Sequence, residues 1–396
     1  DLTKERLRKA GSAIKSENLI TAVGLDTGFR VLKIDTSNLN DVYYTPEESP
    51  QANLLSQIDN IKPDRTPEDL LFQVLVDWGL DLASSIAQES IAGHTVFFVD
   101  TDARTFQMDT SKLESRITDR TVAAIPVHMA GAAPDLDTAI ATGKKRNIKI
   151  LEDAAQAHLG EWRGRKLGAI ADAGTFSFQA SKNLNSGEGG AILSSDAAFI
   201  ERCYAFHTNS SPRKGASPAP AQGGNFRLTE FQATLLASQM TRLEAQAKRR
   251  DANAAHLAKR FAEIGGVAPA ALTEGCTRSA WHLFMFRYNA ADFAGLPRDK
   301  FLKAMAAEGI PCSSGYTPLN KQAFLKNVLA SRGYQRLFSE KRLRQWNEEN
   351  HCPVNDKLCT EAAWLTQNLL LGTREDMEQI AAAVERIKAH AKELAR

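Results

Sequence analysis

Short apolar segments that alternate with helical ones between residues 95 and 195 constrain the fold of this chain more than any other feature. The apolar runs have the length of buried strands and lie at 96–99, 121–127, 148–151, 175–178 and 191–194. A helical stretch, Asp135–Lys145, stands between the second and third runs. Because strands that alternate with helices pack as a mainly parallel sheet with helices on its faces, this part of the chain is predicted to have an α/β fold.

A long helical pattern and a second, smaller unit follow the predicted sheet. Leu228–Ile264 is predicted to be one helix, and the remainder mixes helices with a strand at Trp281–Tyr288. Thr373 followed by Asp376 is a capping box that marks the start of the last long helix. We therefore expect three parts, a small α+β segment at 1–95, a large α/β domain at 96–250 and a small α+β domain at 251–396.

The composition excludes several classes of protein. The chain has 396 residues, of which 43% are hydrophobic, and its net charge is +2. Residues 1–95 hold 15 acidic and 9 basic side chains, so a nucleic-acid partner is not expected. No apolar run is long enough to span a bilayer, so no membrane partner is expected either. The five cysteines form no C-x-x-C pair, and their odd number argues against a disulfide framework, which predicts a cytoplasmic protein.

Two side chains near the ends of predicted strands carry the strongest chemical signal. Asp153 follows the run at 148–151, and Lys182 follows the run at 175–178, just before a glycine-rich turn. Open α/β sheets bind ligands at the carboxyl ends of their strands. Taken alone, such a lysine is usually a solvated surface residue. Together, the pair suits pyridoxal 5'-phosphate (PLP), whose aldehyde bonds to a lysine amine and whose ring nitrogen needs a carboxylate. Lys182 would then also move protons during the reaction.

The sequence around these two residues resembles a known enzyme family. Leu151–His158 and Phe176–Gly190 are similar to the two signatures of the DegT/StrS family, and the likeness continues through Pro126–His128, Asn225–Ala233 and Gly315–Leu319. It covers roughly residues 96–396. The resemblance implies a fold type I, PLP-dependent aminotransferase that moves an amino group from glutamate or glutamine to a keto-sugar, usually nucleotide-linked, or to a related cyclic ketone. It also implies a homodimer.

The resemblance implies roles for five residues. Lys182 matches the lysine that binds the cofactor's aldehyde, Asp153 the partner of the pyridine nitrogen, and Gln156 a residue that contacts the ring. Ser177 matches a phosphate ligand, and Asn225 matches a phosphate contact that reaches in from a second subunit. The presence of Lys182 disfavours the sister group of sugar dehydratases, which have histidine at this position. Three further histidines are expected to be structural, namely His128, His158 and His282.

Residues 1–95 do not continue this likeness. The family's Ser-Gly-Thr turn, whose backbone N–H groups hold the PLP phosphate, and its aromatic residue that stacks on the ring are not recognisable there. Asp1–Ala10, Leu25–Lys33, Asn60–Leu82 and Ile91–Gly93 instead resemble the C-terminal region of the DNA-methylating subunit of type III restriction–modification systems. The two likenesses meet at Val96–Asp100, which indicates a fusion of two truncated genes.

The fusion changes what is expected of the fold and of the activity. A fold type I sheet truncated by the loss of its first strands would lack one wall of the cofactor site and expose apolar surface. Losing the phosphate turn removes several charge-assisted hydrogen bonds of roughly 1.5–3 kcal/mol each, so weak or absent PLP binding is expected. Three interpretations remain open at this point: an aminotransferase, a non-catalytic fragment of a type III DNA methyltransferase complex, and an inactive fusion.

Overall fold

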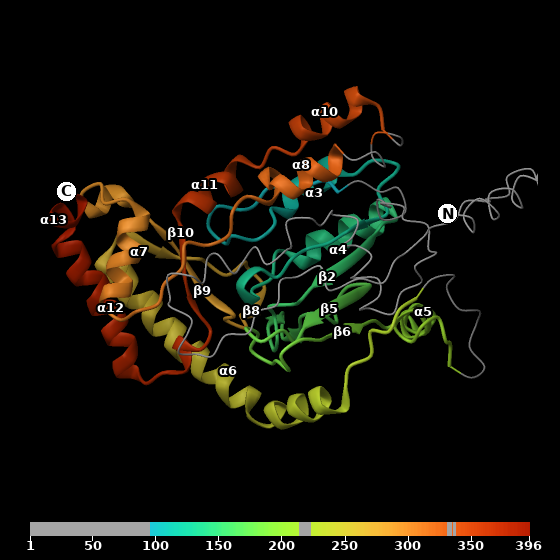
Figure 1. The fold of residues 1–396 in the computed structure, drawn as a ribbon, viewed down its shortest axis with the longest axis horizontal. Coiled ribbons are helices and arrows are strands. Elements are labelled where there is room, and N and C mark those ends of the chain that lie inside the picture. The colour runs from blue at the N-terminus through green and yellow to red at the C-terminus, as the bar shows by residue number, and fades with distance from the viewer. Residues whose placement is uncertain (1–95, 214–222, 331–334, 336–337) are drawn as a thin grey trace, which may run out of the picture. The chain divides into compact units, whose positions relative to one another are not determined.

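The computed structural model describes residues 96–213, 223–330, 335 and 338–396. By its internal contacts the chain divides into two compact units, residues 1–89 and residues 90–396. All described residues belong to the second unit, and Figure 1 labels most of its helices and strands. The elements predicted within residues 1–95, and the resemblance of that segment to a methyltransferase subunit, lie outside the described residues.

A four-stranded sheet lies in the N-terminal half of the described residues. Its strands lie in the order β1 (Ala123–Ala124), β2 (Lys149–Asp153), β5 (Ala173–Ser177) and β6 (Gly190–Leu193). The first three strands are parallel, and β6 runs antiparallel to β5. The strands predicted at 148–151, 175–178 and 191–194 are therefore confirmed, and the run at 121–127 contains the short strand β1.

Helices and short strands surround this sheet. The helix predicted at Asp135–Lys145 is confirmed as α4 (Leu136–Arg146). The Asp135 side chain caps its first turn by accepting a hydrogen bond from the Thr138 N–H. Asn147 ends the helix in the left-handed conformation. The remaining elements of this part are η3 (Thr110–Lys112), α3 (Leu113–Arg116), η4 (Met129–Gly131), β3 (Glu161–Trp162), β4 (Arg165–Lys166) and α5 (Ala197–His207).

The strand predicted at 96–99 is wrong. This segment has no strand assignment, because its backbone hydrogen bonds go to side chains rather than to a neighbouring strand. Trp346 and Arg116 donate to the carbonyl oxygens of Val96 and Phe98, at 2.7 and 3.1 Å. The Phe98 N–H donates to the Asn350 side chain at 2.7 Å. An apolar run by itself does not distinguish a strand from an extended segment that is held by such side chains.

The long helix α6 (Glu230–Ile264) connects the sheet with a second group of elements. It begins with a capping box between Thr229 and Gln232, which agrees with the helix predicted over Leu228–Ile264. The predicted domain boundary at 250 and 251 falls inside this helix and stays a prediction. No helix within the described residues is long and apolar enough to cross a membrane.

An antiparallel sheet organises the C-terminal part. Its strands lie in the order β10 (Ala362–Thr366), β9 (Leu283–Tyr288) and β7 (Val267–Pro269). The predicted capping box of Thr373 and Asp376 is confirmed at the start of α12 (Arg374–Ala389). The other elements here are β8 (Cys276–Arg278), η5 (Ala290–Phe293), α7 (Arg298–Ala307), η6 (Leu319–Lys321), α8 (Ala323–Leu329), α10 (Glu340–Glu349), α11 (Pro353–Glu361), η7 (Leu369–Leu371) and α13 (Ala391–Ala395).

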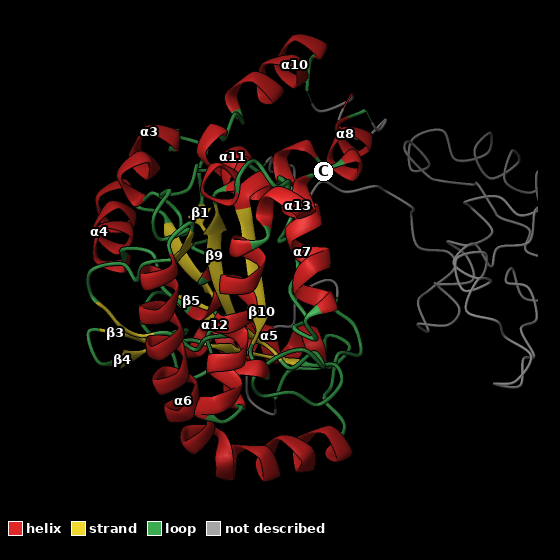
Figure 2. Cartoon of the chain, turned by 90° about the vertical axis from the view of Figure 1, so that its left-hand side faces the viewer, coloured by secondary structure: helices red, strands yellow, loops and turns green. Residues whose placement is uncertain are grey.

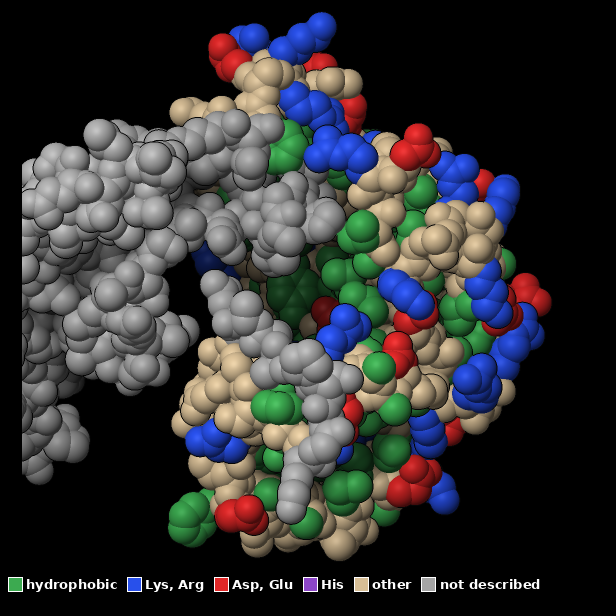
Figure 3. All heavy atoms as spheres, turned by 90° about the vertical axis from the view of Figure 1, so that its right-hand side faces the viewer, with side chains coloured by type: hydrophobic (Ala, Val, Ile, Leu, Met, Phe, Trp, Pro, Cys, Tyr) green, Lys and Arg blue, Asp and Glu red, His purple; other side chains and the backbone are tan. Residues whose placement is uncertain are grey.

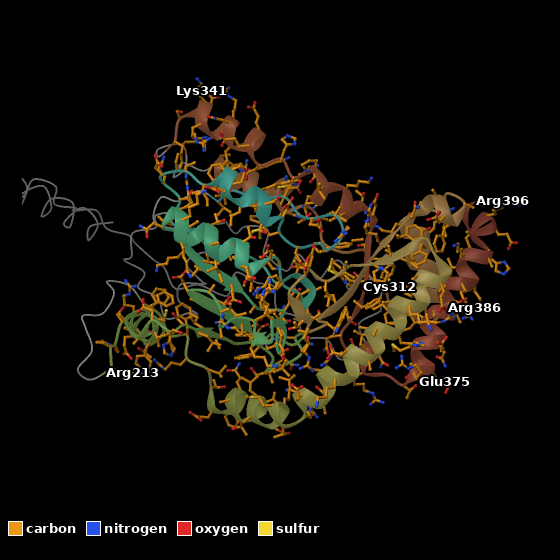
Figure 4. All side chains as sticks on the ribbon, turned by 180° about the vertical axis from the view of Figure 1, so that it is seen from behind. Arg213, Cys312, Lys341, Glu375, Arg386 and Arg396 are labelled. Carbon is orange, nitrogen blue, oxygen red and sulfur yellow. The ribbon has the colours of Figure 1, made fainter. Side chains whose placement is uncertain are left out.

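The largest hydrophobic core lies between this sheet and the helices α6, α7 and α12, which stand in front of it in Figure 2. Phe284 and Phe286 of β9 pack edge-to-face against Phe261 of α6, with ring centroids 5.7 and 5.2 Å apart. The opposite face of α12 is polar. Glu375 and Arg386 of that helix lie at the outer margin of the molecule (Figure 4). The amphipathic pattern of α12 therefore fixes which of its faces is buried.

The aromatic contacts of this core predict a large loss of stability for Phe286→Ala. The side chain is fully buried, so the cavity left by its removal should lower the free energy of unfolding by about 3–5 kcal/mol. Urea denaturation followed by circular dichroism measures this change. Phe324→Ala in α8 is the control, because Phe324 is 54% exposed, and a loss of about 0.5 kcal/mol or less is expected there. Equal losses in the two variants would contradict the assigned core.

Candidate active site

A buried carboxylate stands at the carboxyl end of β2. Glu152 is 1% exposed, and its carboxylate accepts hydrogen bonds from the backbone N–H groups of Gly168, Ile170 and Ala171 at 2.7–2.8 Å. Its fourth partner is the His128 Nε2 atom, 2.9 Å away. Burial alone would raise the pKa of the Glu152 carboxyl, but the His128 and backbone hydrogen bonds hold this pKa below its ordinary value. The charge is therefore stabilised without exposure to water.

Asp153 and Lys182 lie at the same edge of the sheet. Asp153 is the last residue of β2, and Lys182 follows the parallel strand β5 by five residues. Burial lowers the pKa of the Lys182 amine below its ordinary value, while the charge of the Asp153 carboxylate acts in the opposite direction. The structure thus brings the predicted acid and the predicted amine within electrostatic reach of each other, as expected for the ends of neighbouring parallel strands.

Gln156 is held by two partners from distant parts of the chain. Its Oε1 atom accepts a hydrogen bond of 2.7 Å from the Ala130 N–H, in the turn η4. Its Nε2 atom donates to the Tyr316 hydroxyl, 3.2 Å away. Tyr316 is half exposed and packs against Trp364, with ring centroids 4.8 Å apart. Tyr316 is not among the residues that the sequence predicts for the site, although its motif, Gly315–Leu319, contributes to the family resemblance.

Two buried histidines adjoin Lys182. His158 packs against the rings of Phe176 and Phe178, with centroids 5.3 and 6.0 Å away. Burial lowers the pKa of His158 to about 4, and the nearby Lys182 ammonium acts in the same direction, against a smaller opposing effect of the Ser177 backbone. Burial followed by the Lys182 charge also lowers the pKa of His282 to about 4. Both histidines are therefore neutral at pH 7, which avoids two further positive charges beside the amine.

Ser177 and Asn225 complete the set of predicted site residues. Ser177 is the last residue of β5, and its hydroxyl accepts a hydrogen bond of 3.2 Å from the Gln179 N–H. Asn225 is exposed and forms an antiparallel bridge with Thr208, just before α6. Among the described residues it makes no hydrogen bond to the other four predicted site residues. The structure therefore groups Asp153, Gln156, Ser177 and Lys182 near one sheet edge and leaves Asn225 on the surface.

Comparison with known proteins places this geometry in a family. The sequence pattern of the DegT/DnrJ/EryC1/StrS aminotransferase family matches residues 83–385. The chain belongs to this family. It is 35% identical over 307 residues to an L-glutamine:2-deoxy-scyllo-inosose aminotransferase of Streptoalloteichus tenebrarius, an alignment that covers 75% of this chain and 72% of the relative. A protein of the same name from Streptomyces lividus is 33% identical over 308 residues, which again cover 75% of this chain and 72% of the relative.

Solved structures with the same fold include 3-amino-5-hydroxybenzoic acid synthase. That structure superimposes with a TM-score of 0.62 at 26% identity, over 74% of each chain. The DesV protein of S. venezuelae, solved in complex with a ketimine intermediate, gives a TM-score of 0.59 at 27% identity, over 73% of this chain and 71% of that one. The predicted α/β architecture of fold type I is therefore confirmed.

The family membership also confirms the predicted cofactor, pyridoxal phosphate. The side chains of the described residues suit it chemically. Lys182 supplies an amine whose pKa is lowered by burial, and Asp153 supplies a carboxylate that accepts a hydrogen bond of 3.1 Å from the Ala155 N–H. When bound, the cofactor supplies an electron sink for charge that develops at a substrate carbon.

Because His158 and His282 are neutral in the folded chain, we predict that the free energy of unfolding decreases in mild acid. Each has a pKa of about 4 in the folded chain and about 6.5 when unfolded, so the unfolded state binds more protons between these values. The free energy of unfolding should therefore decrease as the pH falls from about 6.5 to about 4, by up to about 3 kcal/mol per histidine. Urea denaturation at a series of pH values measures this decrease.

Replacing both histidines isolates their contribution from that of the carboxylates. The double variant His158→Gln, His282→Gln should show a shallower pH dependence than the parent chain over the same interval. His351→Gln, which removes an exposed histidine, is the control and should follow the parent curve. A double variant that loses stability as steeply as the parent would show that these two side chains do not titrate as described.

Proposed function

We propose that the chain is a PLP-dependent aminotransferase that moves the amino group of glutamine to the ketone of a cyclic polyol or related keto-sugar. The observation that supports this most directly is the shared sheet edge of Asp153 and Lys182, in a chain whose relatives are named for glutamine and 2-deoxy-scyllo-inosose. The donor becomes a 2-oxo acid and the acceptor an amine. One water molecule is consumed in the first half-reaction and one is released in the second.

Each of four described residues has a separate role in the proposed reaction. Lys182 would hold the cofactor through its aldehyde and would carry the proton at the reacting carbon, a role that its lowered pKa favours. Asp153 would keep the pyridine nitrogen protonated. Gln156, oriented by Ala130 and Tyr316, would contact the ring. Ser177 would bind the phosphate group.

The first test is direct detection of the bond to Lys182. The purified full chain should bind PLP with a visible absorbance band that free PLP lacks, and borohydride reduction should place a pyridoxyl group on Lys182 by peptide mass spectrometry. The chain should also convert 2-deoxy-scyllo-inosose to its amine with glutamine as donor. Lys182→Ala should lose the label and all detectable transfer, because the attachment point and proton carrier are gone.

Lys166→Ala is the matched control for this experiment. Lys166 is an exposed lysine of β4 whose amine pairs with Glu161, so its removal should leave both readouts close to those of the parent. Failure of the parent chain to take up PLP and to transfer the amino group would contradict the proposed function. That failure would support the prediction of weak or absent PLP binding, which we make because no phosphate-binding turn is recognisable in residues 1–95.

We further propose that two copies of the chain associate and that Asn225 of one copy serves the active site of the other. Several large apolar side chains are exposed on β6, on α5 and around the start of α6, and Asn225 lies among them. They are Ile192, Leu193, Phe206, Phe226, Phe231 and Met240. Figure 3, which faces the side that carries α5, shows hydrophobic side chains at the surface. Such exposed apolar area is typical of a protein–protein interface.

Subunit mixing tests the shared site. Asn225→Ala and Lys182→Ala chains should each be impaired alone, yet their mixture should regain activity, because one site of a mixed dimer then has neither substitution. Light scattering should give twice the 43.4 kDa chain mass, and Phe231→Glu should shift the protein toward monomer. Lack of recovery in a mixture that is dimeric by light scattering would contradict the assignment of Asn225 to the partner's site.

The second candidate function concerns residues 1–95 alone. The likeness of that segment to a type III methyltransferase subunit supports a fusion of two genes, with or without a role in a DNA-modification complex. The match to the aminotransferase family extends from residue 83 to residue 385. We therefore place the activity of the protein in the described residues and keep the fusion as a hypothesis, which sequencing across codons 90–105 tests.

A further inference from the structure

Asn183, the neighbour of Lys182, ties the lysine loop to a distant segment. Its side chain is 5% exposed, and its Nδ2 atom donates a hydrogen bond of 2.7 Å to the Ala280 carbonyl. Its Oδ1 atom lies 3.2 Å from the His282 Nδ1 atom. Because His282 is neutral, its ring carries one N–H, and this N–H donates to the Asn183 oxygen. Both polar ends of the amide are therefore used.

The same distant segment is bonded to the turn that orients Gln156. The N–H groups of Ala280 and His282 donate to the carbonyls of Gly131 and Ala130, each at 2.9 Å. The Ala130 N–H in turn donates to the Gln156 side chain. The approach is close, since a Cβ atom on Gly131 would lie 2.8 Å from the Ala280 Cβ atom. The positive φ of Gly131, 98°, also favours glycine at this position.

We propose that Asn183 and His282 act as positioning residues, and that residues 280–282 form the common support that sets Lys182 relative to Asp153. This inference rests on the proposed role of Lys182. Hydrogen bonds run from the loop of Lys182 to residues 280–282, and from these to η4 and Gln156, three residues after Asp153. The loop of the amine and Gln156, which follows the acid by three residues, are thus tied to the same segment, although the sequence separates Asn183 from Ala280 by almost a hundred positions.

The backbone of this support is itself held in a costly conformation. Trp281 has φ = 52°, in the left-handed region that non-glycine residues seldom adopt. Its Nε1 atom donates to Asp251 of α6 at 2.9 Å, and its backbone N–H donates to the Ser279 hydroxyl at 3.1 Å. Strain of this kind persists only where surrounding contacts over-determine the conformation. The support is thus fixed from the α6 side as well as from the sheet side.

The reactivity of Lys182 in the full chain without added cofactor tests this inference. Competitive labelling with acetic anhydride at a series of pH values, read by peptide mass spectrometry after treatment with hydroxylamine, reports the pKa of this amine. Asn183→Ala should release the loop, hydrate the amine and raise its pKa. The labelling rate near pH 8 should fall about threefold or more, because the neutral fraction drops about tenfold per unit of pKa.

A second variant and a matched control separate positioning from general stability. His282→Leu removes only the bond to Asn183 Oδ1 and should move the Lys182 labelling curve in the same direction. Asn253→Ala is the control, because Asn253 is also 5% exposed and its amide also bonds backbone carbonyls, those of Leu370 and Gly372, at 2.9 Å. It should lower the melting temperature and leave the Lys182 curve unchanged.

The outcomes distinguish this inference from the proposed function. If Asn183→Ala and His282→Leu lower the melting temperature as Asn253→Ala does but leave Lys182 labelling unchanged, the two residues are merely structural and the inference is overturned. That result would not affect the detection of PLP on Lys182. Conversely, absence of PLP binding in the parent chain would overturn the proposed function while the labelling shift still reported how the loop is held.

Discussion

The buried carboxylate of Glu152 is the interaction on which the site depends most. It joins β2 to His128 beyond β1 and to the backbone of residues 168–171, so three segments meet at one anion. Such a charge is costly to bury unless its oxygens are fully hydrogen-bonded, and here four donors satisfy them. Because successive side chains of a strand point to opposite faces, burying Glu152 directs the next side chain, Asp153, to the other face. The burial of Glu152 thus determines the face of the sheet on which Asp153 lies.

The turn η4 extends this arrangement toward the C-terminal part of the chain. Its backbone groups bond to Gln156, to Ala280 and to His282, and the Gln107 side chain bonds to both the N–H and the carbonyl of Met129. Turns of this kind have backbone groups that no helix or strand pairs, and each one needs a partner when it is buried. Here those partners come from separate parts of the sequence. The turn therefore holds Gln107, Gln156 and residues 280–282 close together.

The two parts of the described chain are stabilised differently. The C-terminal part has an aromatic core, with Phe261, Phe284 and Phe301 among its fully buried side chains. Within the part of the chain that the structure describes, the sheet instead ends in two edge strands with exposed apolar residues, such as Val122 near β1 and Ile192 on β6. Exposed apolar side chains on edge strands favour aggregation of an isolated domain, whereas in an assembly a second subunit can cover them. The predicted site residues Asp153 and Ser177 lie at the carboxyl ends of β2 and β5, in this less completely covered sheet.

The sequence alone determined the local features. It specified α4 through Asp135, α12 through Thr373 and Asp376, and the strands that end near Asp153 and Lys182, because caps and apolar runs act over a few neighbouring residues. Only the tertiary structure decided that Glu152 pairs with His128, that Tyr316 orients Gln156 and that Asn183 bonds to residues 280–282. It also decided that 96–99 is not a strand. These are contacts between residues far apart along the chain, and their geometry depends on how the elements pack, which no local pattern encodes.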